Sequence, residues 1–136
     1  MMGWFIVNVL IPVFAPLAAL LPFRLFLHAL PEHAHRFLRW PMLIKDGQTA
    51  WVALAFNAAA GYDVFSSSAS WKGAVLIGVV FLGAANILIA ALGGVFPVDD
   101  DVSPGESPWR HYPAMSASAV LTFLSATVFT GVHFLA

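Results

Sequence analysis

The sequence predicts an all-α integral membrane protein, a bundle of four transmembrane helices with a short amphipathic interfacial helix between the first two spans. Of its 136 residues, 60% are hydrophobic and only 10% are charged, whereas soluble domains contain roughly 25% charged residues. Four segments approach the length of about 20 mostly apolar residues that a helix needs to cross a bilayer. Residues typical of turns, including Pro, Gly, Ser and acids, separate these segments.

We expect one membrane domain over residues 1–136, with spans at residues 4–22, 48–64, 71–96 and 112–136. Pro12, Pro16 and Pro22 remove backbone donors from the first span and are expected to kink it. The second span is the shortest and least apolar, because Gln48 and Asn57 dilute its hydrophobic run. The spans and their connections use essentially the whole chain, so no separate soluble domain is expected.

A short helix over residues 31–40 is predicted between the first two spans. Pro31 suits its first position, where a missing N–H costs nothing, and Pro41 follows its end. Its apolar and charged residues separate onto two faces, as in helices that lie in the plane of the membrane interface. The side chains expected to contact lipid headgroups are Arg36, Arg39, Trp40 and Lys45.

The same segment contains Glu32, His33 and His35, which raises a metal site as an alternative. On a helix His33 and His35 point to roughly opposite sides, because successive residues turn by about 100°. They cannot chelate one ion together there. Glu32 and His35 form one Glu-x-x-His motif, whereas di-iron bundles need two such motifs and further carboxylates. The interfacial helix is therefore the preferred interpretation.

Positive charge predicts the orientation in the membrane. The connection between the first and second spans holds four of the six cationic side chains, namely Arg24, Arg36, Arg39 and Lys45. Lys and Arg are enriched in cytoplasmic loops, so this connection is expected in the cytoplasm. An even number of spans then places both termini outside the cytoplasm, in a plasma or inner membrane. Trp and Tyr fall near the predicted span ends, as in the aromatic belts of membrane proteins.

Composition excludes several classes of function. With 6 Lys and Arg against 7 Asp and Glu, the net charge is -1, which leaves no basic surface for nucleic acid. Cys is absent, which removes disulfides and thiolate chemistry. Neither paired carboxylates, nor a Ser-His-acid set, nor a complete metal triad is visible in the sequence. We therefore expect a non-catalytic protein that needs no cofactor.

Small side chains recur every four residues along the fourth span, at Ala114, Ser118, Thr122, Ala126 and Thr130. Such ridges let a neighbouring helix approach closely, and close packing drives helix association in lipid. In the second and third spans the corresponding candidates are Asn57, Gly61 and Asn86. A buried amide in lipid needs a partner on another helix. The candidate partners are the two amides themselves and the hydroxyls of Ser118, Thr122 and Ser125.

These faces either pack the four helices together or leave a surface for another protein. The leading hypothesis is a small polytopic membrane protein that acts as a subunit, assembly factor or immunity-type partner of another integral membrane protein. One alternative is self-association into a channel or holin-like pore lined by hydroxyls of the fourth span with Asn57 or Asn86. Another is a haem or quinone anchor at His28 and His111, which share a predicted depth at the inner boundary.

Overall fold

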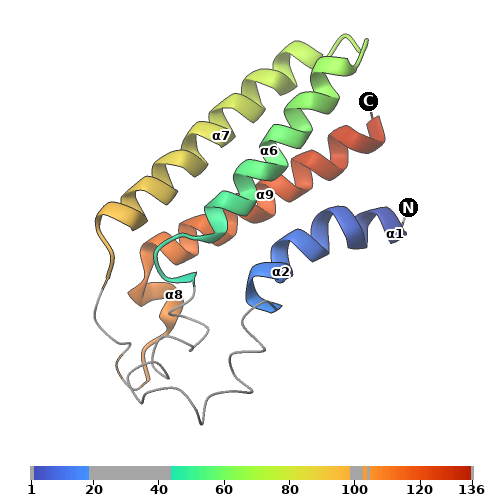
Figure 1. Cartoon of the computed structure of the whole chain (residues 1–136). Helices are drawn as coiled ribbons and strands as arrows, with labels where there is room; N and C mark the ends of the chain where they lie inside the picture. Colours follow the sequence, from blue (N-terminus) through green and yellow to red (C-terminus); the bar gives the residue numbers. More distant parts are fainter. Residues whose placement is uncertain (1, 19–43, 99–102, 104, 136) are drawn as a thin grey trace.

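A computed structural model describes residues 2–18, 44–98, 103 and 105–135. Within these ranges the chain is helical between short connections and contains no strand, which confirms the all-α class for the described part (Figure 1). The predicted interfacial helix at 31–40, with Arg36, Arg39 and Trp40, lies outside the described residues, as does His28.

The three longest described helices pack side by side (Figure 1). They are α6 at Thr49–Ser66, α7 at Lys72–Val95 and α9 at Pro113–Leu135, and a short helix α8 at Pro108–His111 precedes α9. Helix α6 packs along both of the other long helices, and α7 and α9 also contact each other. These helices occupy the positions of the second, third and fourth predicted spans.

The N-terminal segment is helical over all its described residues. It consists of α1 at Met2–Phe5, a π-helical turn η1 at Ile6–Leu10 and α2 at Ile11–Ala18, and we call it the N-terminal helix. The backbone N–H of Ile11 bonds the carbonyl of Ile6, five residues earlier. Pro12 follows at once and has no N–H to donate. The irregular turn therefore falls where the sequence removes a backbone donor.

Two of the described helices, α7 and α9, are long and apolar enough to cross a membrane. Residues Met2–Ala15 form a shorter apolar helix, and α6 is not among the candidates. Helix α6 has 18 residues but carries Thr49, Asn57 and Asp63, which lower its average hydropathy. Of the four spans predicted from the sequence, length and apolar composition thus support two, α7 and α9.

Many large apolar side chains of the described helices lie on the outside, while several polar side chains lie inside, beside an apolar core that includes Phe56 and Phe129. Phe65, Phe81 and Phe123 are 79%, 73% and 73% exposed. In contrast, the interior residues Asn86 and Ser125 are 0% exposed. Soluble proteins bury most of their Phe and expose most of their Asn and Ser. Here most of the described Phe side chains are exposed, and the asparagines of α6 and α7 are buried.

The connection that leads into α6 packs closely against the end of α7. Gly47 adopts a φ of +78°, in the left-handed region that favours glycine. The carbonyl of Asp46 lies against Gly93, where any Cβ would overlap it. The backbone N of Val98 donates to Asp46 Oδ1 at 3.2 Å, and Lys45 Nζ donates to the carbonyl of Val98. These contacts hold the start of α6 beside the end of α7.

Candidate functional site

A polar cluster at the centre of the three-helix packing joins α6, α7 and α9. The side-chain Nδ2 of Asn57 lies 3.1 Å from Oγ of Ser125, and that of Asn86 lies 3.2 Å from the same oxygen. Both asparagines and the serine are buried. The sequence predicted that these amides bond each other or hydroxyls of the fourth span, and Ser125 on α9 proves to be the shared acceptor.

A second polar contact joins the start of α6 to α9. Thr49 Oγ1 donates to Ser118 Oγ at 2.7 Å. The Ser118 hydroxyl lies 3.0 Å from the carbonyl of Met115. The Thr122 hydroxyl lies 2.7 Å from the carbonyl of Ser118 and 3.0 Å from that of Thr49. Ser118 and Thr122, which a pore would use as lining, are therefore bonded within the chain.

The small-residue ridge of α9 is divided between two environments. Ser118 and Thr122 are buried, and both bond Thr49 of α6. Ala126 and Thr130, further along the helix, are half-buried and line a groove beside the N-terminal helix. Ala114 is half-buried near the Asp46 connection. Ala126 also packs against the apolar core cluster, so it borders both the interior and the groove.

Gly61 of α6 is half-buried and faces α7. A Cβ added to it would lie 3.7 Å from Val79, an ordinary van der Waals distance. Gly61 therefore packs toward α7, but the contact does not require that it be glycine.

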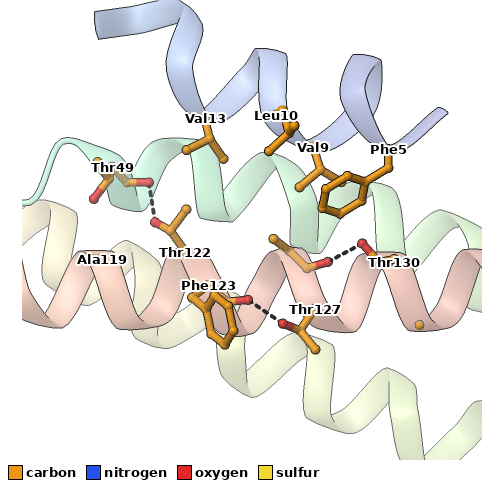
Figure 2. Close-up of a pocket in the computed structure, with 12 residues that line it drawn as sticks. Phe5, Val9, Leu10, Val13, Thr49, Ala119, Thr122, Phe123, Thr127 and Thr130 are labelled. Atoms are coloured by element: carbon orange, nitrogen blue, oxygen red, sulfur yellow. Dashed lines mark hydrogen bonds between the residues drawn. The ribbon is translucent and has the colours of Figure 1, made fainter. Parts of the chain in front are cut away.

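The groove between the N-terminal helix and α9 has a volume of about 670 Å³ (Figure 2). Phe5, Val9, Leu10 and Val13 form its N-terminal wall, while Thr49 of α6 closes one end. The α9 wall consists of Ala119, Thr122, Phe123, Ala126, Thr127, Thr130 and Gly131. These residues extend over more than three turns of α9, which corresponds to about 18 Å along the helix.

The polar atoms in the groove are already hydrogen-bonded. The Thr127 hydroxyl lies 2.8 Å from the carbonyl of Phe123, and the Thr130 hydroxyl lies 2.8 Å from that of Ala126 (Figure 2). The Thr122 hydroxyl also lies within bonding distance of backbone carbonyls. None of these hydroxyls is left to donate to a ligand, so the groove offers shape and apolar contact.

The N-terminal helix contacts α9 mainly near the two chain termini. The Trp4 ring stacks on the His133 ring with centroids 4.0 Å apart and an interplanar angle of 10°. Val9 is buried, and its core cluster includes Phe56 and Phe129. The groove begins beside these contacts and continues toward α2.

His133 also approaches Asp63 at the end of α6. Its Nδ1 lies 3.2 Å from Asp63 Oδ2, and both residues line a pocket of about 230 Å³ with Ser66 and Ser67. Sequence reasoning missed this pair because 70 residues separate its members. The available signal was that both residues fall at the predicted outer ends of their spans. Ser66 bonds Tyr62 O and Ser67 bonds the N–H of Ala69, so the described contacts form no Ser-His-acid chain.

At the opposite end of the bundle, His111 bonds Glu106 through Nδ1 at 3.1 Å. Its Nε2 is buried and has no hydrogen-bond partner among the described residues. His28, the second ligand of the haem hypothesis, lies outside those residues. Across the described ranges, no group of three or more His, Cys, Asp or Glu is placed to hold a metal ion.

Lys45 was expected to contact lipid headgroups. In the structure its ammonium donates to the carbonyl of Val98 and lies 3.7 Å from Asp46 Oδ2. Its side chain is only 11% exposed. Lys45 thus takes part in the contact between the α6 connection and α7, a role that its position in a basic loop did not reveal.

We found no match to this chain among protein family models, curated proteins or solved structures. Two features of the molecule bear on its function: the apolar groove beside α9 and the many exposed Phe side chains of the described helices.

Proposed function

We propose that this chain is an integral membrane protein in which the N-terminal helix, α6, α7 and α9 are the four spans. The exposed Phe side chains support this proposal, because hydrocarbon accepts such a surface and water does not. The described ends of the chain support it too. Both lie at the same end of the bundle, beside the connection between α6 and α7 (Figure 1), as an even number of crossings requires.

The orientation that we propose places both termini outside the cytoplasm of a plasma or inner membrane. Lys45 and Arg110 belong to the connections at the opposite end, and Lys and Arg are enriched on the cytoplasmic side. Single-cysteine labelling tests this orientation directly, because the chain contains no Cys. A cysteine at Gly3 is expected to react from outside intact cells, and one at Gly105 only after lysis. The reverse pattern contradicts the orientation.

We further propose that the protein is non-catalytic and binds a transmembrane helix of another membrane protein in the groove beside α9. This is the role of a subunit, assembly factor or immunity-type partner. The observation that carries the proposal is the apolar α9 wall of the groove, which includes Ala126 and Thr130 of the ridge. Ala126 and Gly131 let a helix backbone approach closely, and the lining hydroxyls are bonded internally.

Filling the groove tests this function. Ala126→Leu places a larger side chain in the groove, and Ala84→Leu adds the same volume on the exposed face of α7 as a matched control. A photocrosslinker at Thr127 is expected to capture one defined membrane protein in native membranes, which is then identified and reconstituted with the pure chain. Ala126→Leu should reduce its binding at least about tenfold, or about 1.4 kcal/mol. Equal binding by both variants contradicts the groove as the contact.

A second copy of the chain and a lipid tail are the other possible occupants. Crosslinked homodimers from Thr127 would indicate self-association, and crosslinks only to lipid would indicate a lipid site. Either result overturns the proposal of a separate protein partner.

A further inference from the structure

The cluster of Asn57, Asn86 and Ser125 contains polar atoms that no described group satisfies. The Oδ1 atoms of Asn57 and Asn86 are both buried and accept no hydrogen bond from the described residues. The residues themselves are 4% and 0% exposed. Such groups are almost always paired, with protein or with ordered water. We propose that this cluster is a binding site for internal water shared by the two amides.

The orientation of the Asn86 amide follows from its neighbours. Its Nδ2 lies 2.9 Å from the backbone O of Leu82 and 3.2 Å from Oγ of Ser125. A backbone carbonyl only accepts hydrogen bonds, so the NH₂ group rather than the oxygen must face Leu82. Both amide hydrogens are thereby used. The Asn86 oxygen, on the other branch of the amide, needs a donor from outside the described groups.

Asn57 needs another partner in either orientation of its amide. In the described orientation Nδ2 donates to Ser125 at 3.1 Å, and Oδ1 has no donor. If the amide is turned over, the Ser125 hydroxyl donates to the oxygen, and the NH₂ group needs an acceptor in turn. Water both donates and accepts, so it can bond the open oxygen of the described orientation or the open NH₂ group of the turned one. A cation can bind only the open oxygen.

Charge also favours water over a cation. The partners in the cluster are two amides, one hydroxyl and the carbonyl of Leu82, all of them neutral. A cation buried among neutral groups retains a large desolvation cost, and hard cations such as Ca²⁺ take six or more oxygen ligands. Water is neutral, needs only a space of about the size of one water molecule, and typically makes about three hydrogen bonds.

The cluster lies inside the three-helix packing, and none of its three residues lines the groove. Asn57 belongs to α6, Asn86 to α7 and Ser125 to α9. Water bound to the two amide oxygens therefore joins α6 and α7, and Ser125 joins both amides to α9.

Selective labelling of asparagine tests the site in the full chain. The sequence contains three asparagines, Asn8, Asn57 and Asn86, so a ¹⁵N-asparagine sample in lipid nanodiscs gives three assignable side-chain NH₂ groups. Nuclear Overhauser transfer from long-lived water to the amides of Asn57 and Asn86 is expected. It should persist unchanged when sodium in the buffer is replaced by choline.

Three outcomes overturn the proposal. No water transfer at either buried amide means a dry cluster, and shifts of their resonances on removal of sodium mean a cation site. The third concerns Asn86→Leu, which removes one amide of the shared site. In this variant, if helix content is retained, the water signal of Asn57 should be lost. Its persistence means that the two amides share no site.

Discussion

The unit formed by α6, α7 and α9 differs from the N-terminal helix in what holds it together. In the three-helix unit, buried amides and hydroxyls bond between helices, as at Asn57 and Ser125. Among residues 2–15 of the N-terminal helix only Val9 is buried, and Trp4 attaches the helix by ring stacking. Both regions are strongly apolar in sequence. Apolar composition alone therefore does not determine which helices pack tightly.

The physical reason lies in the surroundings that we propose. Hydrocarbon is as apolar as a Leu side chain, so burying Leu or Phe against another helix gains little from the hydrophobic effect. Small residues that permit close backbone approach, and polar groups that need partners, supply the association instead. Helix α9 has both on the face toward α6 and α7. The N-terminal helix presents Phe5, Leu10 and Val13 to α9, and a groove remains between them.

The largest expected effect on the three-helix unit comes from Gly93→Ala. The new Cβ would overlap the carbonyl of Asp46, and backbone atoms cannot move aside as a flexible side chain can. We expect a loss of about 3 kcal/mol in the free energy of unfolding, measured by titration from mild detergent into SDS.

Gly94→Ala is the matched control for this change. Nothing lies within 4 Å of a Cβ at Gly94, and alanine is favoured over glycine in a helix by about 1 kcal/mol. We expect this neighbouring variant to be neutral or slightly stabilised. Equal losses in both variants would show that the connection before α6 does not pack on Gly93.

A smaller effect is expected from Ser125→Ala. The change removes the acceptor shared by Asn57 and Asn86, so each of the two buried NH₂ groups loses one hydrogen bond. We expect a loss of about 1 to 2 kcal/mol in the same SDS titration, because a buried donor without a partner retains its desolvation cost.

Ser66→Ala is the control for the loss of a hydroxyl. Ser66 is exposed, and its hydroxyl bonds only the carbonyl of Tyr62 in its own helix. A change within about 0.5 kcal/mol is expected there, as for most surface substitutions. If Ser125→Ala were equally mild, polar contacts would not distinguish the three-helix unit from the N-terminal helix.

The sequence allowed the helices to be located, because runs of apolar residues between turn-forming segments set their ends. It also limited the candidate partners of Asn57 and Asn86 to each other and to three hydroxyls on the last helix. It did not select Ser125 from that set, since the choice depends on the rotation of α9 about its axis. The contact between Lys45 and Val98 was missed because it joins two connections, where no periodic pattern operates.

The groove was not predictable for a related reason. Spacing alone showed that the α9 ridge was suited to packing, but not which part of it the chain itself would cover. That division depends on the path of the N-terminal helix, which contains the irregular turn before Pro12. A proline marks where a helix deviates but does not set the direction of the deviation.

Trp4→Ala is expected to affect the N-terminal helix while leaving the three-helix unit folded. The change removes the ring that stacks on His133 and contacts Phe129. Ring pairs contribute about 0.5 to 1.5 kcal/mol, so we expect partial detachment of the helix. A spin label on a single cysteine at Val7 should show increased mobility.

The control for this change is Phe14→Ala on the same helix. Phe14 is 57% exposed, so its removal should leave the label as restrained as in the parent protein. Unaltered mobility in Trp4→Ala would mean that Val9 and its neighbours suffice to hold the helix. The contrast between the two regions would then be weaker than the described contacts indicate.

The smallest effect is expected from Asp63→Asn, which removes the charge beside His133 and keeps the shape of the side chain. The side chains of His133 and Asp63 are 37% and 25% exposed, so water or headgroups screen the pair. We expect a change within about 0.5 kcal/mol in the SDS titration, and a double-mutant cycle with His133→Gln isolates the coupling. A coupling above about 2 kcal/mol would contradict this, because only a pair removed from water interacts so strongly. The ends of α6 and α9 would then lie deeper in hydrocarbon than the aromatic residues at this end of the bundle suggest.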